Sequence, residues 1–392
     1  MNEWRIENLE KNLEVILDYR GKTPKKSAKG IITLSAKSVK MNYIDYSNIY
    51  YVSQETYNTF MTRGFPKKGD ILLTTEAPLG CVAELPDDKF CLAQRLLTLR
   101  GNPKFLVNKY LLYYLQSDYG QHELLSRATG TTVQGIKRTE FSKVNIKLPP
   151  LNIQKKIAKI LSDIDEKIEL NNKINNNLEK QVQLIFNNHF FNKDKNYTNY
   201  ISSNLLEIAD FLNGLAMQKY TPNDFNEKSY PVLKIKELNQ GFTDKNSDRC
   251  SNKIKPEYII NNGDIIFSWS GTLLIKIWCG NKCGLNQHLF KVTSKKYDKW
   301  FYFLWINYHL KKFISIAKDK ATTMGHIKRA DLEKAFVLIP PEKEYESLNK
   351  ILTPLFENII SNKKENNHLV NLKNYLLPKL MNGEIDIENI EL

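Results

Sequence analysis

Two segments of the chain place apolar residues at alternating steps of four and three, which is the spacing of a coiled-coil helix. The seam residues are Leu161, Ile164, Ile168, Asn171, Asn175, Leu178 and Val182 in the first segment, and Leu348, Leu352, Leu355, Ile359, Asn362, Asn366 and Leu369 in the second. We therefore predict long helices over 151–190 and 342–392. The next seam position of the second segment is Lys373, and Leu372 is expected to supply the apolar contact in its place.

The two seams are nearly palindromic, so folding one back on the other aligns equivalent positions. We predict antiparallel helices in which Asn171 faces Asn366 and Asn175 faces Asn362, with the buried amides setting the register. The alternative is that these asparagines face solvent in an asparagine-rich chain. The residues expected to pair the helices are Ile164, Ile168, Asn171, Asn175, Leu178, Leu355, Ile359, Asn362, Asn366 and Leu369.

The rest of the chain is duplicated in the same order at an offset of 191 to 194 residues. Gly69–Leu72 recurs as Gly263–Ile266, Leu92–Arg95 as Leu285–His288, Thr131–Lys137 as Thr322–Lys328, and Leu148–Pro150 as Ile339–Pro341. A period this long indicates two similar domains and not a solenoid. The predicted organisation is a first domain over 1–150, a central helix over 151–190, a second domain over 191–341 and a C-terminal helix over 342–392.

Each domain mixes strands and helices, so we predict an α+β fold. Short β-branched and aromatic runs at 71–75 and 265–269 are typical of strands. The apolar runs 110–115 and 300–305 have flanks that favour helix. Proline pairs at 149–150 and 340–341 end each domain and suit the start of a helix.

Composition and charge narrow the class of partner. The chain has 392 residues with a net charge of +14, of which +7 falls on 1–150 and +9 on 191–341. Two basic domains favour two polyanion-binding modules. Five cysteines, no apolar leader and no apolar run of about 18 residues predict a cytoplasmic protein without a disulfide framework or membrane span.

Several segments resemble the specificity (S) subunit of a Type I restriction-modification system, over essentially the whole chain. They are Tyr19–Pro24 with its Gly-Lys-Thr-Pro loop, Gly69–Leu72, the junction Leu148–Gln154 followed by Ile157 and Leu161, and the terminal Leu376–Ile385. Two features depart from the family pattern: the second half reads Asn213–Ala216 in place of the Gly-Lys-Thr-Pro loop, and its junction reads Pro341–Tyr345. The first departure suggests that the two domains read different DNA.

The resemblance implies two target-recognition domains, each reading one half of a bipartite, asymmetric site in double-stranded DNA, with the antiparallel coiled-coil helices measuring the unread spacer. It also implies docking of two modification (methyltransferase) subunits and of motor-nuclease restriction subunits. On that basis the chain itself is non-catalytic and holds no cofactor. S-adenosylmethionine, Mg²⁺ and ATP are expected on the partner subunits.

Lysines, arginines, hydroxyl groups and a histidine in the duplicated loops are the candidates for DNA contact. They are Arg20, Lys22, Thr23, Lys25, Lys26, Arg127, Thr131, Thr132, Lys137 and Arg138 in the first domain, and Lys320, Thr322, Thr323, His326, Lys328 and Arg329 in the second. The alternative is that the Thr-Thr loops are turns capping the next element, with solvated lysines outside. None of these residues is assigned to base readout from the sequence.

Two other functions remain open: an enzyme that itself cuts or modifies DNA, and a bipartite DNA-binding regulator. Against the enzyme, the sequence holds no G-x-x-x-x-G-K-[ST] loop and no Asn/Asp-Pro-Pro-Tyr-like loop. Cys279 and Cys283 with His288 could suggest zinc, but a structural site needs four ligands, and the first half has no matching pair. The duplicated Asp70 and Asp264 are interpreted as turn residues at strand starts.

Overall fold

A computed structural model describes residues 4–19, 21–130, 132–222, 224, 227–319 and 325–387. The chain divides into two compact units, residues 1–166 with 370–392 and residues 167–369. The boundaries between domains and helices proposed from the sequence stay predictions. Within the described ranges, no helix is long and apolar enough to cross a membrane.

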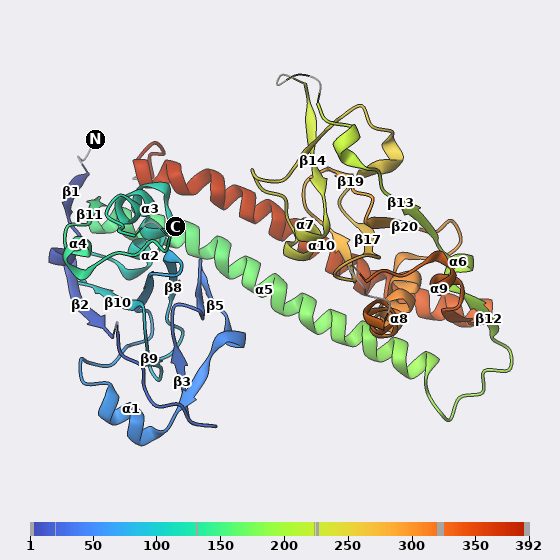
Figure 1. Ribbon diagram of the computed structural model, residues 1–392, viewed down its shortest axis with the longest axis horizontal. Helices are drawn as coiled ribbons and strands as arrows, with labels where there is room; N and C mark the ends of the chain where they lie inside the picture. Colours follow the sequence, from blue (N-terminus) through green and yellow to red (C-terminus); the bar gives the residue numbers. More distant parts are fainter. Residues whose placement is uncertain are drawn as a thin grey trace. The chain divides into compact units, whose positions relative to one another are not determined.

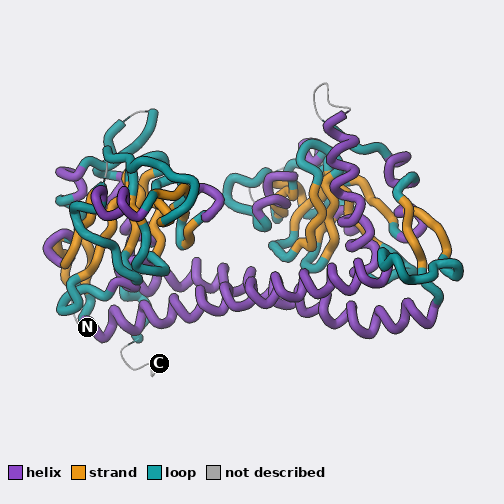
Figure 2. The backbone as a smooth tube through the Cα atoms, turned by 90° about the horizontal axis from the view of Figure 1, so that it is seen from below, coloured by secondary structure: helices purple, strands orange, loops and turns teal. Residues whose placement is uncertain are grey.

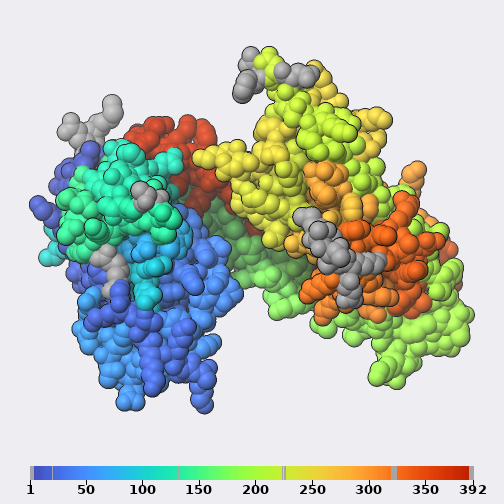
Figure 3. All heavy atoms as spheres, in the orientation of Figure 1, coloured from blue at the N-terminus to red at the C-terminus, as the bar shows by residue number. Residues whose placement is uncertain are grey.

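The first unit is built on a four-stranded antiparallel sheet in the order β2-β10-β7-β8, next to a smaller sheet β6-β3-β9 (Figure 1). Its strands are β1 (Arg5–Asn8), β2 (Leu13–Asp18), β3 (Ile31–Leu34), β4 (Val39–Lys40), β5 (Tyr43–Ile44), β6 (Tyr50–Val52), β7 (Ile71–Thr75), β8 (Leu79–Glu84), β9 (Cys91–Leu92), β10 (Leu96–Gly101) and β11 (Asn145–Leu148). Its short helices are α1 (Gln54–Phe60), α2 (Asn108–Gln116), α3 (Asp118–Leu125) and α4 (Arg138–Phe141). The described residues from Arg5 to Pro150 form one continuous body in the space-filling view (Figure 3).

The second unit repeats this plan with a four-stranded sheet in the order β13-β20-β17-β18 and a second sheet β15-β14-β19-β16. Its strands are β12 (Ile201–Asn204), β13 (Asp210–Asn213), β14 (Ser229–Leu233), β15 (Arg249–Ser251), β16 (Ile259–Ile260), β17 (Asp264–Ser268), β18 (Leu274–Trp278), β19 (Cys283–Leu285), β20 (Leu289–Thr293) and β21 (Phe336–Ile339). Its helices are α6 (Leu205–Ile208), α7 (Ile235–Gln240), α8 (Lys299–Asp319) and α9 (Arg329–Glu333).

The strand register is duplicated along with the strand order. Leu97 of β10 pairs with Leu73 of β7, and Phe290 of β20 pairs with Phe267 of β17. In each unit the first strand closes on the last, because β1 pairs with β11 and β12 pairs with β21. The α+β fold of two similar domains is therefore observed, and the runs at 110–115 and 300–305 are helical.

The apolar face of each main sheet packs on the helices of its own unit. In the first unit, Leu73 and Leu97 share a buried cluster with Tyr110 and Tyr114 of α2. In the second, Phe267 of β17 shares one with Trp305 of α8 and with Phe186 near the end of the central helix. Burying these large side chains drives each unit to fold around its own core.

Each unit also contains part of two long helices, α5 (Leu151–Phe190) and α10 (Glu342–Asn382), which can be followed in Figures 1 and 2. Residues 167–190 of α5 and the 342–369 part of α10 belong to the second unit. There, Asn171 contacts Asn366 while Asn175 contacts Asn362, so the contacting residue numbers rise along one helix as they fall along the other. The two helices are antiparallel, and their apolar seam faces inward.

The expectation for Leu372 was wrong. Its side chain is 36% exposed, whereas Lys373 stays on the seam with its side chain only 12% exposed. Lys373 keeps that position because its ammonium lies 2.7 Å from both carboxylate oxygens of Asp165 on α5. A buried cation is tolerated where a carboxylate pairs with it.

Candidate nucleic-acid interface

The duplicated sequence motifs meet at one point in each unit, held by the same backbone hydrogen bonds. In the first unit, Thr75 at the end of β7 donates its N–H to Arg95 O at 2.9 Å and accepts from Ile136 N at 2.9 Å. In the second unit, Trp269 donates to His288 O at 3.4 Å and accepts from Ile327 N at 3.1 Å. We call this arrangement of strand end, turn and loop the junction of each unit.

A three-residue turn connects β9 to β10 at the first junction. Ala93 N donates to Leu34 O at 2.9 Å, and Gln94 O accepts from Ala36 N at 3.4 Å, so the turn is tied to the neighbouring sheet. In the second unit Asn286 N donates to Leu233 O at 3.3 Å in the same way. Between the buried residues Ala93 and Leu96, the side chains of Gln94 and Arg95 are exposed.

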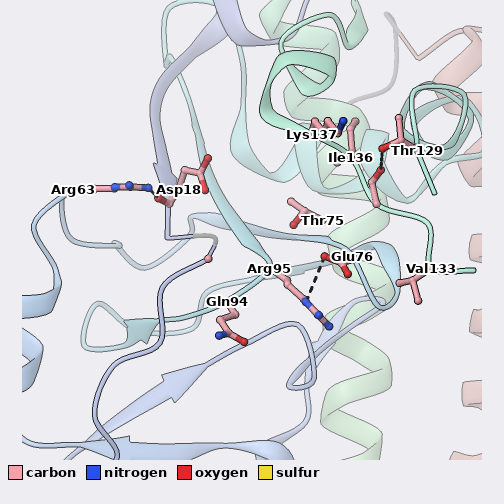
Figure 4. Close-up of a pocket in the computed structure, with 12 residues that line it drawn as sticks. Asp18, Arg63, Thr75, Glu76, Gln94, Arg95, Thr129, Val133, Ile136 and Lys137 are labelled. Carbon is pink, nitrogen blue, oxygen red and sulfur yellow. Dashed lines mark hydrogen bonds and ion pairs between the residues drawn. The ribbon is translucent and has the colours of Figure 1, made fainter.

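A hollow of about 700 Å³ lies beside this turn in the first unit. Its lining combines cations, carboxylates and amides: Asp18, Gly21, Arg63, Thr75, Glu76, Gln94, Arg95, Thr129, Val133, Gly135, Ile136 and Lys137 (Figure 4). Arg95 Nε lies 3.5 Å from Glu76 Oε2, and Arg63 donates to the backbone carbonyl of Asp18. An open, polar, mixed-charge hollow suits groups that form hydrogen bonds better than an apolar ligand.

The Gly-Lys-Thr-Pro loop reaches the same hollow. Gly21 lines it with φ +75°, a left-handed conformation that favours glycine. Thr23 accepts a hydrogen bond from the Gln94 side chain, which joins the loop to the β9–β10 turn. Lys22 and Lys25 are exposed, and Lys26 is exposed with its Nζ 4.9 Å from the centre of the Tyr50 ring. Arg20 lies outside the described residues.

The residues predicted around the first Thr-Thr loop divide into two groups. Thr132 and Lys137 are exposed, and Lys137 lines the hollow. Arg127 and Arg138 instead contact carboxylates of their own unit. Arg127 Nη1 lies 3.0 Å from Glu123 Oε2, and Arg138 Nη1 lies 2.7 Å from Glu10 Oε2.

The hydrogen bond from Arg138 holds the pKa of Glu10 below its usual value, so this ion pair stays formed near neutral pH. Thr131 lies outside the described residues. The Arg127 and Arg138 cations are therefore engaged within the unit, while Lys137 is placed to meet a ligand.

In the second unit the junction is aromatic. The Trp269 ring centre lies 6.1 Å from that of His288 and 6.2 Å from that of His326, and Trp269 Nε1 donates to Asn213 Oδ1 at 3.1 Å. Lys328 and Arg329 are exposed at the start of α9. Lys320, Thr322 and Thr323 lie outside the described residues. The two units thus share a backbone frame and present different side chains on it.

The asparagines named for helix pairing lie in the second unit, between α5 and α10. Asn171 is 1% exposed, and its Nδ2 donates to Asn366 Oδ1 at 2.9 Å and to Glu365 Oε2 at 2.7 Å. Asn362 Nδ2 donates to Asn175 Oδ1 at 2.9 Å. Of the apolar residues named with them, Ile164 and Ile359 are buried, and Ile168, Leu178, Leu355 and Leu369 are half-buried.

The duplicated aspartates close equivalent turns at the start of equivalent strands, Asp70 directly before β7 and Asp264 as the first residue of β17. Asp70 Oδ2 accepts from Lys67 N at 2.8 Å, and Asp264 Oδ2 accepts from Asn261 N at 2.9 Å. Each also pairs with a cation on the neighbouring strand: Arg100 lies 2.7 Å from Asp70, and Lys291 lies 2.9 Å from Asp264. The turn interpretation is confirmed, and the ion pair explains why the aspartates are buried or nearly so.

Cys279 and Cys283 are buried, and burial raises the pKa of both thiols. Nowhere in the described part of the chain do three His, Cys, Asp or Glu side chains gather as a metal would require. Cys279 Sγ instead lies 3.9 Å from Ile360 O. Both cysteines are packed as small apolar residues.

Gln94 and Arg95 are site residues that the sequence reasoning missed. The signal was present, because Leu92–Arg95 recurs as Leu285–His288. The repeat by itself indicates only the duplication, since spacing along the chain does not reveal that this turn, the Gly-Lys-Thr-Pro loop and the Thr-Thr loop meet. Arg63 was missed for the same reason, and no repeat marks it.

Duplicated units on a shared frame, each with a polar or aromatic junction, define a two-module binding protein. A family model described as the Type I restriction modification DNA specificity domain matches residues 4–180 and again 197–371. These matches span far more than half of the 392 residues. The chain belongs to this family.

Relatives and a solved structure agree with that assignment. The Type I restriction enzyme MjaIX specificity subunit of Methanocaldococcus jannaschii is 27% identical over 372 residues, covering 86% of this chain and 82% of the relative. The putative MjaX specificity subunit of the same organism is 24% identical, covering 98% and 94%. The crystal structure of an S subunit from M. genitalium shares the fold, with a TM-score of 0.57, 19% identity and 96% of both chains covered.

Proposed function

We propose that this chain is the DNA-recognition subunit of a Type I restriction-modification complex and that each unit reads one half of a bipartite, asymmetric site. The observation that carries the proposal is the shared junction: one backbone frame, present twice, bears Gln94 and Arg95 in one unit and Gln287 and His288 in the other. Equivalent frames suit the same kind of ligand, and different side chains suit different base sequences.

Charge supports double-stranded DNA as that ligand. Net charges of +7 over 1–150 and +9 over 191–341 favour binding to phosphates in both halves of the chain. Exposed Lys22, Lys25 and Lys137 are suited to phosphate contact in the first unit, and Lys328 and Arg329 in the second. Phosphate contacts of this kind position a protein on DNA without specifying sequence.

In this proposal the chain performs no chemistry. Two modification subunits bind S-adenosylmethionine and methylate adenine, and restriction subunits use ATP and Mg²⁺ to translocate and cut. The chain supplies recognition and the paired helices that measure the unread spacer. It acts in the cytoplasm, where its DNA and these partners are found.

The test is methylome sequencing of cells that express the modification subunits with and without this chain. A bipartite N6-methyladenine motif that disappears when the chain is deleted supports the proposal. Replacing residues 1–150 by another recognition domain should then change one half-site and leave the other intact. An unchanged methylome, together with tight specific DNA binding by the purified chain alone, would instead favour a DNA-binding regulator.

A further inference from the structure

We propose that the β9–β10 turn is the base-reading element of the first unit and that the Arg95 guanidinium recognises a guanine in its half-site. This inference rests on the proposed function and deepens it, because it assigns base readout to a named side chain. The equivalent turn of the second unit, with His288 in place of Arg95, reads a different base pair.

The first argument is that the turn holds Arg95 rigidly. Its backbone makes hydrogen bonds through Ala93 N, Gln94 O and Arg95 O to two separate segments of the unit, the end of β3 with the residues after it and the end of β7. Arg95 has φ +65°, a left-handed conformation that costs free energy for any residue other than glycine. Such a conformation persists where the surroundings determine it, and it is concentrated at binding sites.

The second argument is that the Arg95 side chain is free to meet a ligand. Its side chain is 48% exposed, and its nearest carboxylate, on Glu76, is 40% exposed at 3.5 Å (Figure 4). Arg100 and Arg127 lie closer to their carboxylates, at 2.7 and 3.0 Å, with side chains 15% and 21% exposed. Exposed ion pairs are weak, so DNA can displace Glu76 from Arg95 at small cost.

The third argument is chemical. A guanidinium presents two parallel N–H donors, which match O6 and N7 of guanine in the major groove. Gln94, directly before it, has an amide that can both donate and accept, as contact with adenine requires. Lys137 on the same hollow is suited to a neighbouring phosphate. The hollow therefore contains groups for base readout beside a group for positioning.

The second junction carries a different side chain at the position equivalent to Arg95. His288 occupies the position of Arg95, as the hydrogen bonds of Thr75 and Trp269 show. Its Nδ1 is buried and has no hydrogen-bond partner among the described residues. An imidazole cannot present the paired donors of a guanidinium, so the frame is kept while the base preference changes.

The experiment uses the complete complex of this chain with its modification subunits, bound to a panel of duplexes that carry every single-base change in both half-sites. We expect Arg95→Ala to lose about tenfold to a hundredfold discrimination at one guanine position of one half-site. Discrimination at every other position should stay as in the wild type. His288→Ala should change discrimination only in the other half-site.

Three further variants keep the result interpretable. Arg95→Gln retains a planar hydrogen-bonding group and should shift the preference at that position from guanine toward adenine. Arg5→Ala removes an arginine of the same unit that does not line the hollow, so its discrimination should match the wild type. Lys137→Ala should weaken binding to all duplexes alike and reduce the salt dependence.

The proposal is overturned if Arg95→Ala and Arg95→Gln reduce binding to every duplex by one factor, or leave the panel unchanged. It is also overturned if the affected position is not a guanine. Failure of the proposed function is distinguishable, because the wild-type complex would then recognise no bipartite site at all.

Discussion

The Lys373 ammonium on α10 lies 2.7 Å from both carboxylate oxygens of Asp165 on α5, and the Tyr113 hydroxyl of α2 donates to the same carboxylate at 2.9 Å. The ion pair joins the two long helices, and the hydrogen bond from Tyr113 connects them to α2 of the first unit. Burial lowers the pKa of Lys373 and the Asp165 charge opposes that effect, while burial and the same charge raise the pKa of Tyr113.

Breaking this pair on one side should destabilise the first unit. Lys373→Met leaves a mostly buried carboxylate without its cation, and we expect a loss of about 3 kcal/mol in unfolding free energy. The double variant Asp165→Asn with Lys373→Met should recover most of that loss, because no buried charge remains and the new amide oxygen can still accept from Tyr113. Chemical denaturation of the three proteins measures this. A double variant less stable than Lys373→Met would contradict it.

The asparagine contact between the helices should appear as a coupling energy. Asn171 and Asn366 are joined by a partly buried hydrogen bond, so a double-mutant cycle with alanine at both positions should give about 1 kcal/mol of interaction. Asn187→Ala offers a control, since that residue is exposed on the same helix as Asn171. Unfolding of each variant supplies the four free energies. Strictly additive effects would mean that the contact contributes no interaction free energy.

Lengthening both helices by one heptad should lengthen the unread spacer of the DNA site. Seven residues inserted after Asn175 and seven before Asn362 preserve the seam, because the insertions meet across the contact between those two residues. Seven residues add about 10 Å of helix, which corresponds to about three base pairs. Methylome sequencing would show the new motif. A changed half-site with unchanged spacing would refute the idea that the helices measure the spacer.

The second unit should lose stability as the pH falls below about 6.5. His189, near the end of α5, forms a 2.8 Å hydrogen bond with the Tyr200 hydroxyl and lies beside Lys195 and Glu344. Its pKa is lowered, first by burial and then by the Lys195 charge. His189 therefore binds a proton in the unfolded chain over a pH range in which it stays neutral in the folded chain, so lowering the pH favours unfolding.

His189→Gln should reduce this dependence between pH 7 and pH 5, measured as unfolding midpoints across that range. Part of the dependence should remain, because burial also lowers the pKa of His309 in the same unit. The pKa of Glu344 is also lowered, by its hydrogen bonds from Lys195 and Tyr200. Glu344 therefore changes the stability mainly below pH 4.5, the ordinary pKa of a glutamate, which is outside this range. An equal slope in wild type and His189→Gln would assign the dependence to other groups.

The two duplicated aspartates should differ in importance. Asp70 is 1% exposed and receives two hydrogen bonds from Arg100, whereas the Asp264 side chain is 20% exposed and pairs with Lys291. We expect Asp70→Asn to cost about 3 kcal/mol and Asp264→Asn about 1 kcal/mol. Hydrogen exchange of β7 and β17 reports each unit separately. A larger loss of protection at β17 would reverse this ranking.

The sequence by itself determined the features that depend on local order along the chain. Alternating steps of four and three identify a helical seam wherever they occur, and the mirror placement of Asn171 and Asn366 already favours antiparallel helices. The repeat of Gly69–Leu72 and of Leu148–Pro150 is likewise visible without coordinates, because a duplication preserves order and spacing. Both patterns can be identified from the order and spacing of residues alone, and both correspond to features of the fold.

Only the tertiary structure decided which polar side chains meet. Arg127 and Arg138 look as available in the sequence as Lys137, yet Glu123 and Glu10 engage them, and Glu10 lies far away along the chain. Lys373 remains on the seam because Asp165, on the other helix, neutralises it. The β9–β10 turn contacts the Gly-Lys-Thr-Pro loop through the hydrogen bond from Gln94 to Thr23, and Thr75 at the end of β7 bonds both to this turn and to Ile136. Contacts between distant segments follow from packing of the whole unit, and no pattern along the chain encodes them.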